Sequence, residues 1–210
     1  ANFTANRIEV FKSDFTSTRV SGTFQDPNLP ARYSPFNIQN INNELYVMFA
    51  KREPGNSDES SGAGTGVVDV FGTDGKLIRR FAAGGKLNAP WGVALAPSNF
   101  GVFSGDILVG NFGDGRVTAF DPVTGAKVGQ ISDAGNQPIA LDGLWGIAFG
   151  NGRAGNLTNG LYFAAGPNYE LNGLYGRLLA DQPIPGGGTP YAFSFAIHDA
   201  SDDLFDSAGD

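Results

Sequence analysis

The sequence has no cysteine and one histidine, His198, among its 210 residues. Without cysteine the chain forms no disulfide, no thiolate-ligated zinc or iron–sulfur site and no cysteine nucleophile. With one histidine, a two-histidine metal site is excluded, and a Ser-His-Asp triad would depend on a residue close to the C-terminus. We expect His198 to be a surface or edge residue rather than a general base.

Basic residues are also scarce, since 14 Lys and Arg stand against 21 Asp and Glu, for a formal charge of −7. Nucleic-acid binding depends on clustered positive charge, so we expect no nucleic-acid partner. No apolar run approaches the ~20 residues of a membrane-spanning helix, so we expect no membrane span. The first residue is Ala1, from which we expect either a removed leader or a longer parent chain.

Glycine and proline are abundant, at 31 and 12 residues, and this much turn chemistry argues against a helical protein. An internal repeat is present, because aligned segments place Phe36, Trp91 and Trp145 at spacings of 55 and 54 residues (91 − 36 and 145 − 91). Further apolar or alternating runs, each typical of a short strand, recur in order with these segments, at 45–49, 107–112 and 161–165, then 7–11, 67–71 and 116–120, then 20–24, 77–81 and 127–131.

Four short strands per ~50-residue unit predict an all-β protein built as a β-propeller with four-stranded blades. An ordinary β-sandwich is the alternative. The expected units are about 1–33, 34–88, 89–141 and 142–180, followed by a Gly/Pro-rich and acidic tail over 181–210. They amount to about three and a half blades, so we expect the remaining blades to come from an N-terminal part or another chain. Trp91 and Trp145 are expected to pack between blades.

Several longer phrases resemble an uncharacterised bacterial family of exported, NHL-like β-propeller proteins, some of which end in a PEP-CTERM sorting tail. The phrases are FQDPNLP (24–30), PFNIQNI (35–41), LNAPWGVALAP (87–97), LVGNFGDG (108–115) and LDGLW (141–145). The resemblance implies a ring of about six blades and a secreted or cell-surface bacterial protein. The sequence departs from the family after residue 180, where no sorting tail is matched, and the family has no established activity.

Loops on one face of the expected propeller are the candidate ligand or partner sites, because loops carry function more often than scaffolds do. The longest spans 51–66, and a second spans 166–173. The alternative is that both are solvated loops without a ligand. The candidate binding residues are Lys51, Arg52, Asp58, Glu59, Asn168 and Glu170.

Asn111 and Asp114 follow a predicted strand, and Asn2 occupies the corresponding place in the first unit. Six-bladed lactonases, which the expected ring resembles, bind calcium through Asn, Asp and Glu side chains, and such oxygen ligands suit a hard cation. Asn2, Asn111 and Asp114 are therefore candidate calcium ligands. The alternative is that Asn111 satisfies backbone groups and that Asp114 makes a hairpin turn.

We therefore expect an exported β-propeller that acts as a binding or assembly module with no catalysis of its own and no cofactor. Its expected partners are a protein, a polysaccharide, further copies of itself or a missing N-terminal part. The alternative is a calcium-dependent hydrolase or lyase of lactonase-like propeller type. No catalytic residue is assigned from the sequence.

Overall fold

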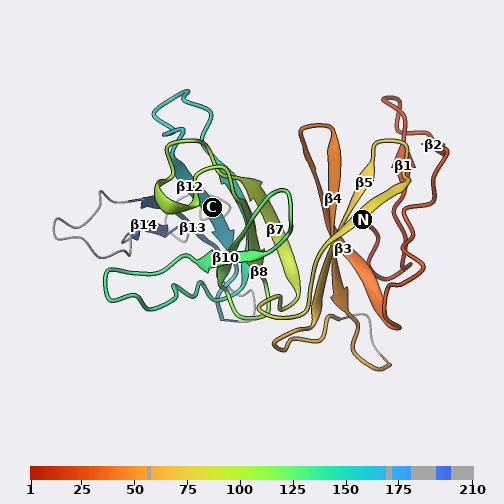
Figure 1. The fold of residues 1–210 in the computed structure, drawn as a ribbon, viewed down its shortest axis with the longest axis horizontal. Helices are drawn as coiled ribbons and strands as arrows, with labels where there is room; N and C mark the ends of the chain where they lie inside the picture. Colours follow the sequence, from red (N-terminus) through yellow and green to blue (C-terminus); the bar gives the residue numbers. More distant parts are fainter. Residues whose placement is uncertain (56–57, 169–171, 181–192, 200–210) are drawn as a thin grey trace, which may run out of the picture. The chain divides into compact units, whose positions relative to one another are not determined.

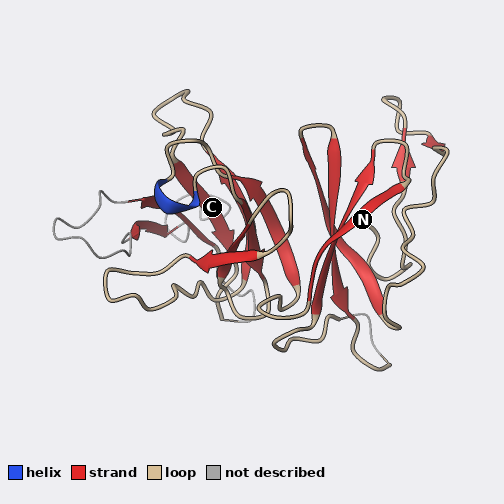
Figure 2. Ribbon diagram, in the orientation of Figure 1, coloured by secondary structure: helices blue, strands red, loops and turns tan. Residues whose placement is uncertain are grey.

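The computed structural model describes residues 1–55, 58–168 and 172–180, together with the backbone of 193–199. The chain is built from short strands, with one turn of 3₁₀ helix, η1 (Gly101–Phe103) (Figure 2). The strands are β1 (Val10–Phe11), β2 (Ser17–Thr18), β3 (Tyr33–Ile41), β4 (Glu44–Lys51), β5 (Gly66–Gly72), β6 (Leu77–Ala83), β7 (Pro90–Leu95), β8 (Ile107–Asn111), β9 (Val117–Phe120), β10 (Lys127–Gln130), β11 (Leu144–Phe149), β12 (Gly160–Ala165), β13 (Leu174–Ala180) and β14 (Phe193–Asp199).

These strands form antiparallel meanders in which each strand pairs with the next along the chain (Figure 1). Three sheets have four strands, in the orders β3-β4-β5-β6, β7-β8-β9-β10 and β11-β12-β13-β14, and β1 and β2 form a two-stranded sheet. The predicted all-β architecture with four strands per repeat is therefore confirmed. Among the described residues no helix is long and apolar enough to cross a membrane.

The predicted tail contains one strand that the sequence analysis missed. Strand β14 pairs with β13 over seven residues, from Ala180↔Phe193 to Leu174↔Asp199, and completes the last sheet. Residues 193–197 read Phe-Ser-Phe-Ala-Ile, which is an alternating strand pattern. The Gly/Pro-rich run before it and the acidic residues after it hide that pattern when composition alone is considered.

The predicted fourth run of the first repeat is displaced as well. The strand lies at Ser17–Thr18, whereas the 22–24 segment bonds to the β5–β6 turn of the next repeat. The amide of Gly22 donates to Asp74 O at 2.6 Å, and the amide of Phe24 donates to Gly75 O at 2.9 Å. The segment's hydrogen bonds are thus made to a neighbouring turn instead of to its own sheet.

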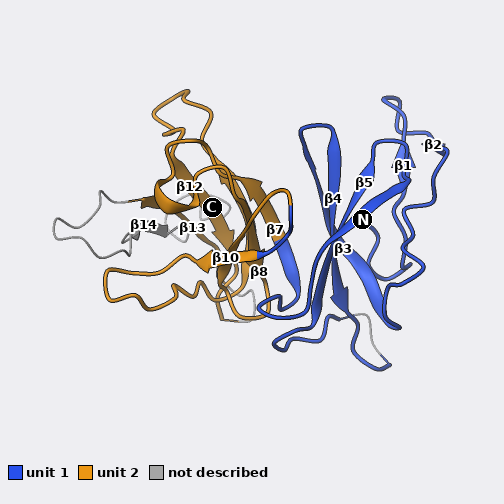
Figure 3. Ribbon diagram, in the orientation of Figure 1, with its two compact units in different colours: residues 1–91, 124–126 blue, residues 92–123, 127–210 orange. Residues whose placement is uncertain are grey.

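The chain divides into two compact units, residues 1–91 with 124–126 and residues 92–123 with 127–210 (Figure 3). In the first unit Phe24 joins the core formed by Val47, Phe49, Val67 and Phe71. In the second, a single cluster extends from the strands of the third repeat to those of the fourth, including Leu108, Ala119, Leu144, Leu161 and Phe163. Each core is therefore assembled from more than one sequence repeat.

Within each unit the first strands of successive repeats are in contact. In the first unit the Asn37 side-chain amide donates to the Trp91 carbonyl at 2.8 Å. In the second unit a Cβ on Gly92 would lie 2.8 Å from the Trp145 carbonyl oxygen, so only glycine permits that approach. Trp145 also packs against Phe112 of the preceding repeat, with ring centroids 4.5 Å apart.

The turn between the third and fourth strands of a repeat packs on the preceding repeat through a glycine. Gly75 has φ +79° and Gly125 has φ +69°. A Cβ on Gly75 would lie 2.9 Å from the Phe24 ring, and one on Gly125 would lie 1.9 Å from the Phe81 carbonyl oxygen. These glycines provide both the left-handed turn and the close approach.

The Gly125→Ala substitution should destabilise the protein more than Gly85→Ala does. Gly85 has φ +58°, but no described atom lies within 4 Å of a Cβ built there, so its replacement costs only the left-handed conformation, about 1–2 kcal/mol. Gly125→Ala adds the clash with Phe81, which costs a further ~1–3 kcal/mol. Urea unfolding of the two variants measures the difference, and equal losses would contradict the close approach.

Candidate functional site

A buried ionic network links the first sequence repeat to the β3–β6 sheet. Arg80 on β6 donates through Nε to Asp69 Oδ1 on β5 at 2.9 Å, and through Nη2 to Asp26 Oδ2 in the segment before β3. Its Nη1 reaches Asn28 O at 3.4 Å. The side chains of Asp69 and Asp26 are 0% and 2% exposed, against 31% for Arg80. One guanidinium therefore bonds two buried carboxyl groups from different segments.

A side-chain contact between the third and fourth strands occurs at the same position in two sheets, and in the β3–β6 sheet this contact is ionic. Asp69 lies opposite Arg80 in the β5–β6 register, and Thr118 lies opposite Gln130 in the β9–β10 register. Gln130 Nε2 donates to Thr118 Oγ1 at 3.2 Å. This neutral pair makes a side-chain hydrogen bond at the equivalent position without burying a charge. Burying ions is costly unless they are well paired, so the ionised rung points to a local requirement for charge.

The buried environment of Asp69 raises the pKa of its carboxyl group. Burial is the main reason that its pKa rises from 3.8 to about 6, with Arg80 opposing the rise and Asp26 adding to it. Within the described part of the chain, its Oδ2 is buried and makes no hydrogen bond. The carboxyl group therefore titrates in a mildly acidic range instead of near pH 4.

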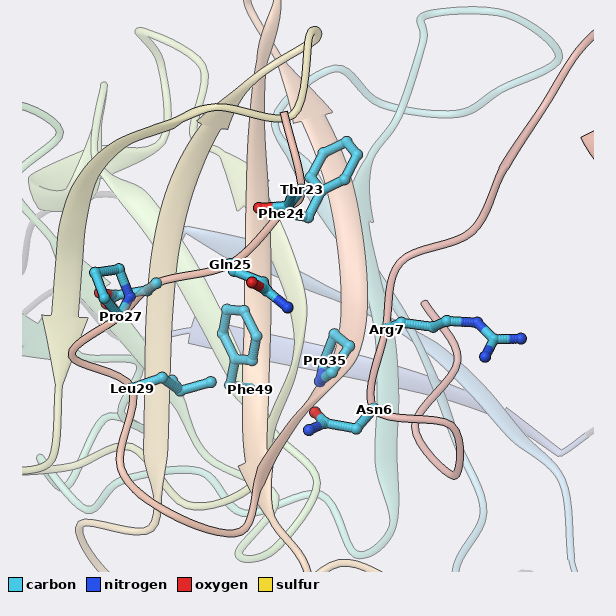
Figure 4. A pocket seen from close by; sticks show the side chains of 10 residues that line it. Asn6, Arg7, Thr23, Phe24, Gln25, Pro27, Leu29, Pro35 and Phe49 are labelled. Atoms are coloured by element: carbon cyan, nitrogen blue, oxygen red, sulfur yellow. The ribbon is translucent and has the colours of Figure 1, made fainter. Parts of the chain in front are cut away.

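A cavity of about 410 Å³ lies beside this network in the first unit, and Asp26 forms part of its wall. Its lining comes from the turn before β1, the segment before β3, and strands β3 and β4 (Figure 4). The lining residues are Asn6, Arg7, Thr23, Phe24, Gln25, Asp26, Pro27, Leu29, Pro35 and Phe49. By drawing the segment that carries Asp26 onto β6, Arg80 fixes this wall.

The cavity combines an apolar floor with uncharged polar groups at its mouth. Phe49 and Pro35 are buried, and the side chains of Asn6 and Gln25 are exposed. The Arg7 side chain points away from the Phe49 ring (Figure 4), and its Nε donates to Glu9 at 2.9 Å. Asp26 is ion-paired with Arg80. Beside these two ion-paired charged residues, the lining offers amides, a hydroxyl and apolar surface, a composition typical of small-molecule sites.

The predicted binding residues of the long loop lie elsewhere in the same unit. Lys51 ends β4, and Arg52 and Glu59 form an antiparallel bridge that closes a hairpin. The Arg52 amide donates to Arg32 O at 2.8 Å, and Asp58 O accepts the amide of Glu53 at 2.9 Å. None of these residues lines the cavity. The hairpin is held by backbone bonds, and a binding role for its side chains stays a prediction.

Of the two binding residues predicted in the second loop, the structure describes one. Asn168 has φ +57°, and its amide donates to Asp142 Oδ2 at 3.1 Å. It belongs to the second unit, whereas the candidates in the first loop belong to the first. Glu170 lies outside the described residues. A shared site for these residues therefore also stays a prediction.

The predicted calcium ligands sit in two hairpin turns. Asn111 is fully buried at the end of β8, and its Nδ2 donates to Asp114 Oδ1 at 3.0 Å. In the other unit, Asn2 Oδ1 accepts the amide of Ala5 at 2.9 Å. Over the described ranges, no three His, Cys, Asp or Glu side chains gather as a metal site would require. These contacts match the turn interpretation, and calcium binding at these residues stays a prediction.

Sequence reasoning missed the ionic network, although a signal for it was present. Asp69 interrupts the apolar run Val67-Val68-Asp69-Val70-Phe71, and Arg80 lies on the adjoining predicted strand. An acid inside a fully apolar strand is buried and needs a partner. The lining of the cavity gave no such signal, since it gathers residues from four separate segments.

The comparisons with known proteins find relatives in a virus, and no family model matches the chain. Three uncharacterized proteins of Acanthamoeba polyphaga mimivirus are each 37% identical to it, over 191, 194 and 150 residues. The matches cover 88%, 88% and 71% of this chain, and 46%, 49% and 27% of the relatives. The chain thus spans about half the length of the first two.

The resemblance to a bacterial exported NHL-like family is therefore wrong, because these homologues are mimivirus proteins. The phrases lie at the strands and turns of the repeats, where Gly, Asn and aromatic residues serve the fold and do not by themselves identify a family. Secretion, a bacterial cell-surface location and a PEP-CTERM relation rested on that resemblance and lose its support.

Among solved structures, two resemble parts of the chain. The PQQ-bound form of aldose sugar dehydrogenase from Streptomyces coelicolor has a TM-score of 0.38 at 28% identity, covering 58% of this chain and 33% of that one. Kuenenia stuttgartiensis hydrazine synthase has a TM-score of 0.40 at 14% identity, covering 85% and 49%. With TM-scores below 0.5, neither likeness bears on the activity of this chain.

The raised pKa of Asp69 predicts how stability depends on pH. Its folded pKa of about 6 exceeds the reference value of 3.8, so the folded protein binds this proton more tightly than the unfolded chain does. The contribution of Asp69 to the free energy of unfolding is therefore largest below about pH 4 and falls as pH rises to about 6. Asp69→Asn should remove that part of the slope.

Chemical denaturation at a series of pH values tests this prediction. Asp14→Asn is the control, because Asp14 is exposed and its hydrogen bonds with Thr16 lower its pKa, so it titrates below the same range. The Asp14 variant should keep the wild-type slope between about pH 4 and pH 6. An unchanged slope in the Asp69 variant would mean that this carboxyl group is not the one titrating.

Proposed function

We propose that the chain forms part of a β-propeller and acts as a binding module with no catalysis of its own. Four-stranded meanders in a fixed order support the propeller, as do the contacts between the first strands of successive repeats within each unit. The third-to-fourth-strand turns add a second set of contacts between repeats, through Gly75 and Gly125. A β-sandwich would not call for such contacts at every repeat.

The ligand site in this proposal is the cavity beside Asp26, and the ligand is small, polar and uncharged, with saccharides as the class that fits best. The carrying observation is that a cavity of about 410 Å³ is lined by the buried Pro35 and Phe49 and by the exposed Asn6, Thr23 and Gln25. Carboxamides and a hydroxyl group donate and accept hydrogen bonds to sugar hydroxyls, and the apolar floor accommodates ring faces.

The ionic network gives this site a firm wall. Arg80 holds the segment carrying Asp26, and the amides of Gly22 and Phe24 bond to the β5–β6 turn on the other side of Gln25. A preordered wall reduces the entropy lost when a ligand binds. Asp26 is also ion-paired with Arg80, and a neutral ligand would not compete for that pairing.

Nuclear magnetic resonance titration with glucose, maltose, cellobiose and N-acetylglucosamine tests the proposal. At least one sugar should shift the amide signals of residues 6, 23–26, 28 and 29 saturably. Gln25→Ala should weaken its binding about 5–10-fold, as expected for the loss of one hydrogen bond. Gln25 is exposed, so this change should leave the unfolding midpoint unaltered.

The matched control is Gln137→Ala, which removes another exposed loop glutamine in the second unit and should leave the affinity unchanged. Absence of saturable amide shifts in residues 6, 23–26, 28 and 29 with all four sugars would overturn the saccharide site. Equal weakening by both variants would show that the sugar binds elsewhere.

A further inference from the structure

Residues 2–11 repeat residues 111–120 at a constant offset of 109 positions (111 − 2). Four residue types coincide, Asn2 with Asn111, Phe3 with Phe112, Arg7 with Arg116 and Phe11 with Phe120. The partner aromatics Phe36 and Trp145 differ by the same 109 positions (145 − 36). The offset corresponds to two of the ~50-residue repeats, so the first and third repeats are the related pair.

The two copies have the same local structure. The Asn2 amide donates to Arg7 O at 2.8 Å, and the Asn111 amide donates to Arg116 O at 2.9 Å. The ring of Phe3 lies 5.0 Å from that of Phe36, as Phe112 lies 4.5 Å from Trp145. Asn2 and Arg7 thus form an isolated antiparallel bridge before β1, and Asn111 and Arg116 make the equivalent contact between the end of β8 and the start of β9.

The copies differ in what covers the third strand. In the later copy β8 pairs with β9 from Gly110↔Val117 to Ile107↔Phe120, and Phe120 is 5% exposed. In the earlier copy Ala1 is the counterpart of Gly110, and Phe11, the counterpart of Phe120, is 54% exposed. The same position thus changes from buried to exposed between the two copies.

The backbone of β1 presents hydrogen-bonding groups on the side where β8 would lie. Lys12 N donates to Thr16 O, and Val10 lies opposite Thr18, so the even-numbered residues of this segment point toward β2. Arg7 exchanges both of its backbone bonds with Asn2 on the other side. Because strand residues alternate, the amides of Glu9 and Phe11 point to that same side.

We propose that the Glu9–Phe11 edge is a docking site for one extended apolar strand, antiparallel to β1 and continuous with Ala1, in the place that β8 occupies on β9. The Asn2–Arg7 pair already sets its register, which puts the next two hydrogen-bonded rungs at Glu9 and Phe11. The occupant has the character of Ile107-Leu108-Val109, all of which are buried in the later copy.

Two further observations favour this occupant. The mimivirus relatives are about twice as long as the matched segment. Such proteins therefore contain additional residues that can form a strand continuous with this segment. The carboxylate of Glu9 can be covered, because Arg7 and Asn2 already hold it, with Arg7 Nε at 2.9 Å. Asp69, at the corresponding position of β5, is fully buried beside an arginine.

The test adds Ile-Leu-Val directly before Ala1 and measures amide hydrogen exchange. Exchange at Glu9 and Phe11 should slow roughly tenfold relative to a control that carries Ile-Leu-Pro, because proline opposite Glu9 cannot donate to the Glu9 carbonyl, which removes one of the two hydrogen bonds of that pair and weakens the pairing of the whole strand. Phe11→Ala should also lower the urea midpoint more in the Ile-Leu-Val protein than in the unextended chain, since Phe11 becomes buried.

Equal exchange rates in the two extended proteins would overturn the proposal. Protection by a free Ile-Leu-Val-containing peptide, without protection by the fused extension, would also overturn it, because the strand would then not be continuous with Ala1. The site is independent of the ligand cavity, so failure here leaves the saccharide titration and its Gln25 variant unaffected.

Discussion

No sheet in this chain can bury both of its faces alone, and this constraint organises the structure. A four-stranded sheet has two faces, and a stable core needs a second layer against at least one of them. The first core recruits Phe24 from the preceding repeat, and the second combines strands of two repeats. The glycine turns and first-strand contacts follow from it, because they let neighbouring sheets approach closely.

The Asp26–Arg80–Asp69 network distinguishes the second repeat from the third, which has a neutral pair at the same position. A Thr–Gln pair satisfies the same rung in the next sheet without the cost of burying charge. The ionised version reaches beyond its own sheet, because a single guanidinium can bond in several directions at once. Its effect is to order the chain before β3, which forms one wall of the cavity of about 410 Å³ in the first unit.

The strand order was predictable because period-2 alternation and Gly-containing turns are local signals, as in Val67–Phe71 followed by the turn at Gly75. Strand β14 was missed because its signal is short and lies between segments of very different composition. The cavity could not be predicted, since Asn6, Gln25 and Phe49 meet only in the folded chain. The burial of Asp69 could have been predicted from the sequence. Its partner, Arg80, was harder to predict.

The length of the connection between second and third strands alternates along the chain. It is a tight turn from Asn2 to Arg7 and from Asn111 to Arg116, but it runs from Lys51 to Gly66 in the second repeat and from Ala165 to Leu174 in the fourth. Loop length and the 109-position offset therefore share one period, which is two repeats. The repeating unit of this sequence is then a pair of ~50-residue repeats, and duplication or loss of that unit would change the number of repeats in twos.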